Sequence, residues 1–223
     1  MAGQKAKAAT AYKAAWDYFT AGRQLLPGDC WQSQYELTLK LYEAAVETAY
    51  LNGDFESMEK LVQIVIEKAR AILDKIRVYE IKSEALVAQD KFVEAMNNGL
   101  QILKFLGVQF PQEPSQDDII LAIQETQLAY QKKSIAELIN LPLMSDPIQL
   151  AILRILLSIA TAAYMAFPKL HTLLICKQMT LSIQYGNAPA STYGYACYGL
   201  ILCAIVGEIE VGYQFGQLAL DLL

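Results

Sequence analysis

Apolar and polar positions along this chain follow the spacing of α-helices from end to end. Leu61, Ile64 and Val65 recur at intervals of three and one residues, and Met96 and Leu100 lie four apart. Such intervals place the apolar side chains on one face of a helix. The pattern predicts about nine to eleven helices, which we place near residues 8–26, 33–51, 55–73, 76–88, 92–106, 115–130, 134–141, 147–166, 169–185, 191–206 and 210–223.

One short phrase recurs along the chain at a nearly constant distance. Asn52-Gly53-Asp54-Phe55 is echoed by Asp90-Lys91-Phe92, whose aromatic residue lies 37 residues later. A third echo, Gly207-Glu208-Ile209, lies another 117 residues on, or three steps of 39. A period of this length with a turn before each helix is typical of tetratricopeptide-like repeats. We therefore expect an all-α fold, a right-handed superhelical array of antiparallel helix hairpins forming an α-α solenoid.

The repeat divides the chain into three parts of one solenoid. We expect regular hairpins over residues 1–110, an irregular connection with short helices over 111–146, and apolar variant hairpins over 147–223. Helix starts are indicated by Ser33 with Glu36, by Ser115 with Asp118, and by Asp146 followed by proline. The first predicted helix, residues 8–26, has the spacing of the second helix of a repeat hairpin, and no sequence for the other helix of that hairpin precedes it. We expect the chain to be an internal segment of a longer polypeptide.

Charge nearly disappears from the second half of the chain. Between Ile155 and Gly207 the only residues with a full charge are Lys169 and Lys177. The apolar stretches there are interrupted by Arg154 or are shorter than the roughly 20 residues that a membrane span needs. We therefore expect burial against neighbouring helices and no membrane insertion. A homodimer through the apolar C-terminal half is left open.

Composition and charge exclude one class of partner and favour one cellular location. Hydrophobic residues make up 54% of the chain and the formal net charge is −5, so no positive field is available for phosphate backbones. We expect no nucleic-acid partner. The four cysteines are widely spaced and no secretory signal precedes the first helix, which favours reduced thiols and a cytoplasmic location.

Signatures of catalysis are missing from the sequence. No phosphate-binding loop, dinucleotide fingerprint, kinase element or metalloprotease motif occurs, so we expect no enzyme activity, no cofactor and no metal site. The single histidine, His171, has apolar neighbours, which favours packing or capping over a role as phosphoacceptor or base. Gly212 and Gly216 fall at small positions of the repeat, where we expect close helix packing.

One charge pattern repeats with the 37-residue period. Superposing the two clear hairpins matches three pairs of residues: Lys40 with Arg77, Glu43 with Glu80, and Glu47 with Glu84. In tetratricopeptide arrays these first-helix positions face the concave groove. The pattern indicates either a groove for a basic or mixed-charge segment or a merely solvated face with charges three and four residues apart.

Several longer phrases resemble the helical repeat region of large cyanobacterial multidomain signalling proteins. The resemblance covers about residues 12–220 and includes these phrases: Ala21-Gly22-Arg23-Gln24-Leu25-Leu26-Pro27, Val78-Tyr79-Glu80-Ile81-Lys82, Leu106-Gly107-Val108-Gln109-Phe110-Pro111 and Leu181-Ser182-Ile183-Gln184-Tyr185-Gly186-Asn187. In that family a serine/threonine kinase domain is followed by an AAA-like ATPase domain, this helical region, a GAF sensor domain and often a histidine kinase. The resemblance implies an ATP-dependent kinase as the parent protein, with every catalytic motif outside this chain.

Two functions remain as hypotheses. The favoured one is a non-catalytic interaction and coupling scaffold between the ATPase and the sensor or output domains, with segments or neighbouring domains of the same parent as partners. The alternative is a small-molecule sensor whose apolar pocket is lined by four tyrosines, Tyr193, Tyr195, Tyr198 and Tyr213.

Overall fold

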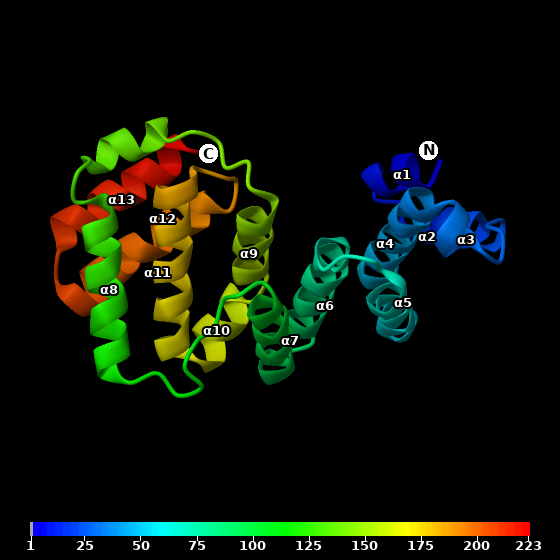
Figure 1. Ribbon diagram of the computed structural model, residues 1–223, viewed down its shortest axis with the longest axis horizontal. Helices are drawn as coiled ribbons and strands as arrows, with labels where there is room; N and C mark the ends of the chain where they lie inside the picture. The colour runs from blue at the N-terminus through cyan, green and yellow to red at the C-terminus, as the bar shows by residue number, and fades with distance from the viewer. Residues whose placement is uncertain (1) are drawn as a thin grey trace. The chain divides into compact units, whose positions relative to one another are not determined.

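The computed structural model describes residues 2–223, and the chain in this range is all-helical (Figure 1). No β-strand occurs among these residues, and one isolated bridge joins Leu143 to Asn187. The α-helices are α1 (Ala2–Ala8), α2 (Tyr12–Gln24), α3 (Cys30–Ser33), α4 (Tyr35–Leu51), α5 (Phe55–Lys68), α6 (Ile76–Ala88), α7 (Phe92–Phe105), α8 (Gln116–Tyr130), α9 (Pro147–Ser158), α10 (Ala160–Ala166), α11 (Pro168–Tyr185), α12 (Ser191–Ile201) and α13 (Ile209–Asp221). Two 3-10 turns, η1 (Leu73–Lys75) and η2 (Ile135–Asn140), and one π-helical turn, η3 (Leu202–Val206), complete the described elements.

The described range holds more helices than the nine to eleven expected from the sequence. The short helices α1 and α3 were not expected, and the predicted helix at 147–166 is broken into α9 and α10. The break falls at Ile159, which is fully buried over Gly99 of α7, and the Ser158 hydroxyl donates to the Ile155 carbonyl. A serine hydroxyl that bonds a carbonyl of the preceding helical turn often bends the helix. The continuous apolar pattern of residues 147–166 gave no sign of this bend.

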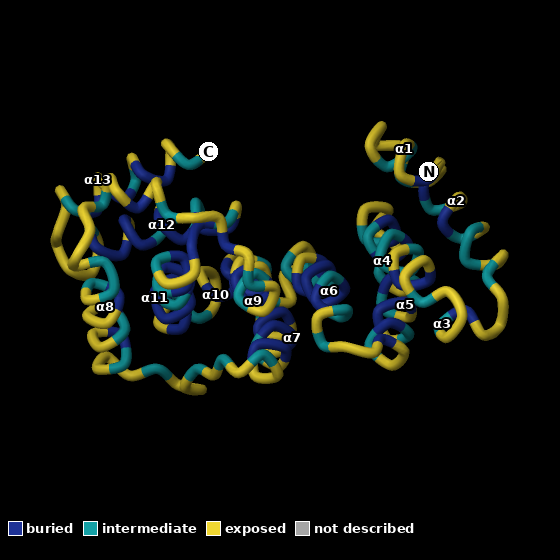
Figure 2. The backbone as a smooth tube through the Cα atoms, turned by 45° about the horizontal axis from the view of Figure 1, so that its top comes forward, coloured by how far each residue is buried: buried dark blue, intermediate teal, exposed yellow. Residues whose placement is uncertain are grey.

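The chain divides into two compact units, residues 2–91 and 92–223. In the first unit α4 packs against α2 and α5, and α6 packs against both α4 and α5. The buried faces of these helices meet in one core that includes Phe19, Val46, Val62 and Ile81 (Figure 2). The unexpected helix α1 packs on α2, where Gly3 lies directly over the Phe19 ring.

The second unit is built around α11, which packs against α8, α9, α10 and α12, while α12 packs against α13. Its core contains an aromatic cluster in which the Phe215 ring contacts three tyrosines, Tyr130, Tyr195 and Tyr198. The low charge of residues 155–207 is explained by this burial, because ten residues of α11 and six of α12 are buried.

The recurring phrase of the sequence corresponds to a recurring backbone turn. Two residues before the start of α5, α7 and α13, the backbone has a positive φ: +73° at Gly53, +57° at Asp90 and +84° at Gly207. The same conformation occurs at Thr10, two residues before α2, with φ of +56°. The three echoes are therefore equivalent structural positions, and a fourth turn of this type escaped the sequence pattern.

Hydrogen bonds follow one scheme at the turns around Thr10, Gly53 and Asp90. The Gly53 N–H donates to Tyr50 O and the Asp54 N–H to Ala49 O, each at 2.9 Å. The turn at Asp90 repeats both bonds, with Asp90 N–H to Val87 O and Lys91 N–H to Leu86 O. This is the Schellman arrangement, in which a left-handed residue satisfies the last carbonyls of a helix. The carbonyls at the ends of α4 and α6 are thus paired within the turn.

Helix starts confirm two of the three predicted capping signals. Asp146 accepts from Ile148 N and Gln149 N, and Ser115 forms a reciprocal capping box with Asp118. The capping box predicted at Ser33 is wrong. Ser33 is the last residue of α3, its hydroxyl donates to Asp29 O, and α4 begins after Gln34 without a side-chain cap.

No individual helix within residues 2–223 combines the length and the apolar composition that a bilayer crossing requires. Taken together, α9 and α10 meet those two criteria, with a bend of 40° where they join.

Close packing of α12 on α13 depends on Gly212, and we expect Gly212→Ala to destabilise the protein. A Cβ atom there would lie 2.4 Å from Cys203 Sγ and 2.6 Å from the Gly199 carbonyl oxygen, so the expected loss is about 1–3 kcal/mol. Gly216, four residues later on α13, has open space beside it. Gly216→Ala is the matched control and should gain about 0.5–1 kcal/mol from helix propensity. Urea unfolding measures both changes, and equal shifts in the two variants would contradict the packing argument.

Candidate functional site

The six predicted groove residues lie on two helices of the first unit. Lys40, Glu43 and Glu47 are on α4, and their equivalents Arg77, Glu80 and Glu84 are on α6. Spacings of three and four residues place each set along one helix face. Because α4 packs against α6, residues from the two sets come together.

The contact between the two sets is a chain of ion pairs that we call the charge ladder: Lys7, Glu47, Arg77 and Glu80. Glu47 lies between two cations, with Lys7 Nζ at 2.8 Å and Arg77 Nη2 at 3.0 Å. Arg77 Nη1 also donates to Glu80 Oε2 at 3.3 Å. The ladder therefore joins α1, α4 and α6 through their side chains. Lys7 was missed by sequence reasoning because no helix was expected before α2.

The side chains of the ladder differ in how far they are buried. The Glu80 side chain is 5% exposed, whereas those of Glu47 and Arg77 are 24% and 34% exposed. Burial of Arg77 acts to lower the pKa of its guanidinium, but the nearby charges of Glu47 and Glu80 outweigh it, and the pKa is raised. Arg77 is thus a permanent cation that neutralises carboxylates on both helices.

The remaining predicted groove residues lie outside the ladder. Lys40 and Glu84 are exposed, and Glu43 is half-buried. The pKa of Tyr50 is raised, first by burial and second by the negative charge of Glu84. The face formed by α4 and α6 therefore carries four carboxylates. Glu47 and Glu80 pair with Arg77, and the charge of Glu84 also helps to raise the pKa of Arg77.

The four tyrosines proposed to line a pocket do not share one environment, and that expectation is corrected. Tyr195 and Tyr198 are fully buried against Phe215, whereas Tyr213 is 61% exposed. The Tyr195 hydroxyl donates to Asn187 Oδ1 at 2.8 Å, so its polar end is satisfied within the core. Helical spacing accounts for the difference, because Tyr213 lies between Gly212 and Phe215 in sequence but points away from their buried face.

His171 lies half-buried on α11 with its ring edge-on to Tyr164, the ring centroids being 5.5 Å apart. Its Nε2 atom is buried and has no hydrogen-bond partner within residues 2–223. Burial lowers the pKa of the imidazole. These contacts are those of a packing residue.

Comparison with known proteins gives one similarity. The chain is 20% identical to hybrid signal transduction histidine kinase G of Dictyostelium discoideum, over 99% of this chain. The aligned region spans only 7% of the length of that relative. No model of a known protein family matches the chain, and no solved structure matches it.

Replacement of Arg77 tests the charge ladder. In Arg77→Met the buried Glu80 carboxylate and Glu47 lose a shared cation, and we expect the free energy of unfolding to fall by about 1–3 kcal/mol. The value is below that of a fully buried pair because Arg77 is one-third exposed. Lys40→Met, which removes an exposed cation from α4, serves as control and should leave stability unchanged. Chemical denaturation measures the free energy of unfolding of both variants. If Arg77→Met and Lys40→Met were equally stable, the ladder would not contribute to the stability of the fold.

The buried imidazole predicts a pH dependence of stability. Since the pKa of His171 is lower in the folded protein than the value of 6.5 for a free imidazole, the unfolded chain binds the proton more readily. Stability is then present above about pH 6.5 and decreases as the pH falls through the unfolded value. His171 is the single histidine, so His171→Phe should flatten the melting temperature between about pH 7.5 and 5.5. If the melting temperatures of the unmodified protein and of His171→Phe changed with pH in the same way, His171 would not be the group responsible.

Proposed function

We propose that this chain is a non-catalytic protein-interaction and coupling scaffold within a multidomain signal-transduction kinase, between its ATPase and its sensor or output domains. The similarity to a signal transduction histidine kinase supports a signalling role, since it extends over nearly the whole chain. The chain spans a small part of that long relative, which is consistent with a segment that works beside other domains. We further propose a cytoplasmic location and partners within the same parent protein, without nucleic acid.

The proposed architecture is a tetratricopeptide-like solenoid. Its support is local: Gly53 and Asp90 have the same left-handed turn 37 residues apart, and each is followed by a helix that begins at a phenylalanine. In the first unit α6 packs against both helices of the α4/α5 pair, as a following hairpin does in a repeat array. Each helix pair would then transmit its position to the next through nearest-neighbour packing.

The observation that carries the proposal is the charge ladder across α4 and α6. Glu47 is shared between Lys7 and Arg77, so its position depends on two neighbouring helices at once. Lysine or arginine side chains that a partner brings to this face would compete with Lys7 and Arg77 for the carboxylate of Glu47. The competition would change how tightly α4 is held to α1 and α6. A basic segment is therefore the partner class that we propose for this face.

A binding experiment with a lysine-rich peptide tests this function. We expect the peptide to bind the 223-residue chain with salt-dependent affinity and to slow amide hydrogen exchange in α4 and α6. Glu43→Gln/Glu84→Gln should weaken binding by about tenfold, because two carboxylates at the rim lose their charge. Both substitutions keep side-chain shape and spare the buried Glu80. Isothermal titration calorimetry gives the affinities.

The control removes the same amount of charge elsewhere. Glu36→Gln/Glu67→Gln changes two exposed carboxylates outside the predicted groove and should leave the affinity nearly unchanged. Equal weakening by the two double variants would mean that only net charge attracts the peptide, and the groove would be rejected. Undetectable binding to the unmodified chain would reject it as well.

A further inference from the structure

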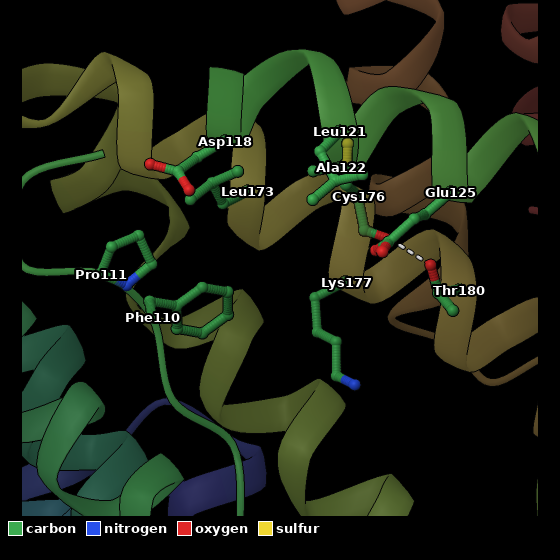
Figure 3. A pocket seen from close by; sticks show the side chains of 10 residues that line it. All are labelled: Phe110, Pro111, Asp118, Leu121, Ala122, Glu125, Leu173, Cys176, Lys177 and Thr180. Carbon is green, nitrogen blue, oxygen red and sulfur yellow. Dashed lines mark hydrogen bonds between the residues drawn. The ribbon is translucent and has the colours of Figure 1, made fainter. Parts of the chain in front are cut away.

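A pocket of about 250 Å³ lies between α8 and α11 in the second unit (Figure 3). Phe110 and Pro111, from the segment that leads into α8, form one of its sides. The pocket is smaller than the roughly 300–1,000 Å³ of sites for drug-sized ligands. It is therefore suited to a compact metabolite, and it lies apart from the aromatic core around Phe215.

Part of the pocket wall is apolar, and one of its leucines is open to solvent. Phe110, Leu121 and Leu173 contribute to it, and Leu121 is 55% exposed although its neighbours Ile119 and Ile123 are buried. A ligand with an apolar body would cover this leucine and gain the free energy of removing apolar surface from water. The wall thus favours a ligand that is partly hydrophobic.

Two opposite charges face the pocket from different helices. Glu125 on α8 and Lys177 on α11 lie toward one end of it, whereas Asp118 and Pro111 lie toward the other (Figure 3). Glu125 and Lys177 form no ion pair with each other, and neither has another ion-pair partner within residues 2–223. Asp118 differs from them, because its carboxylate accepts two hydrogen bonds from Ser115 in the helix cap.

The other polar groups of the wall are already engaged or neutral. The Thr180 hydroxyl donates to the Cys176 carbonyl at 2.9 Å, the bond drawn in Figure 3. Burial raises the pKa of the Cys176 thiol to about 11, so it is protonated at neutral pH and reacts poorly. The pocket is consequently equipped to bind a molecule and lacks an activated nucleophile.

We propose that this pocket binds a small zwitterion with an apolar body, the chemical class of the free apolar amino acids. The ligand ammonium group pairs with Glu125, its carboxylate pairs with Lys177, and its side chain covers Leu121 between Phe110 and Leu173. The proposal rests on the pocket alone and is independent of the scaffold function on α4 and α6. It adds a ligand site to the second unit, at a different place from the tyrosine cluster.

Three matched probes test the proposal by nuclear magnetic resonance of the 223-residue chain. L-phenylalanine carries both charges, 3-phenylpropionate lacks the ammonium group, and phenethylamine lacks the carboxylate. We expect L-phenylalanine to shift amide signals of residues 121–125 and 173–180, and each single-charge probe to bind about tenfold more weakly. Equal affinities for the three probes would overturn the zwitterion assignment. Absence of shifts in these segments at about 10 mM L-phenylalanine would overturn the site.

Charge-neutralising variants separate the pocket from nonspecific binding. Glu125→Gln and Lys177→Gln retain side-chain size and should each weaken L-phenylalanine binding by about tenfold. Lys169→Gln, on the same helix as Lys177 but outside the pocket lining, is the matched control and should bind normally. Circular dichroism melts establish that the variants are folded. Unchanged binding in both pocket variants would contradict the proposal.

Discussion

The left-handed turn that follows α1, α4 and α6 is the constraint on which the regular part of the structure depends. At such a turn the chain must reverse direction while the last carbonyls of the finished helix still need donors. The bonds from Gly53 and Asp54 satisfy this need, and the next helix starts at once with Phe55. Since Asp90 and Thr10 adopt the same conformation without being glycine, the requirement is for the turn itself, at a steric cost that the flanking helix contacts offset.

The last turn of this type shows how the repeat is varied. At Gly207 the preceding helix ends in the π-helical turn η3, and the Glu208 N–H reaches back six residues to Leu202 O, one more than at the other turns. One additional residue is thereby accommodated before α13 begins. Insertions of this kind are consistent with the longer spacing between the echoes in the second half of the chain. The sequence pattern shows that the repeat is longer there, but it does not show where the additional residue lies.

Two of the three predicted helix caps and the turn at Gly53 were found from the sequence because these signals act within a few residues. The turn at Gly53 and the caps at Asp146 and Ser115 are formed by bonds between near neighbours. Features that depend on distant partners could not be predicted in the same way. The bend at Ile159 lies where this side chain packs over Gly99 of α7, and the ion pair of Lys7 with Glu47 spans 40 residues. The charge periodicity located α4 and α6 as the relevant helices but could not show that Arg77 already neutralises two of the carboxylates.

Both units have apolar cores, but the first unit adds ion pairs between its helices. In the first unit an ion-pair chain crosses α1, α4 and α6 at partly exposed positions, where competing cations and salt can reach it. In the second unit α12 meets α13 through the backbones of Gly199 and Gly212 and through the rings around Phe215, contacts that salt does not weaken. The proposed scaffold function requires contacts of the first kind, because a charged partner can compete with ion pairs that are partly exposed. The second kind suits a rigid body that holds a pocket such as the one between α8 and α11 in a constant shape, because close-packed cores deform little.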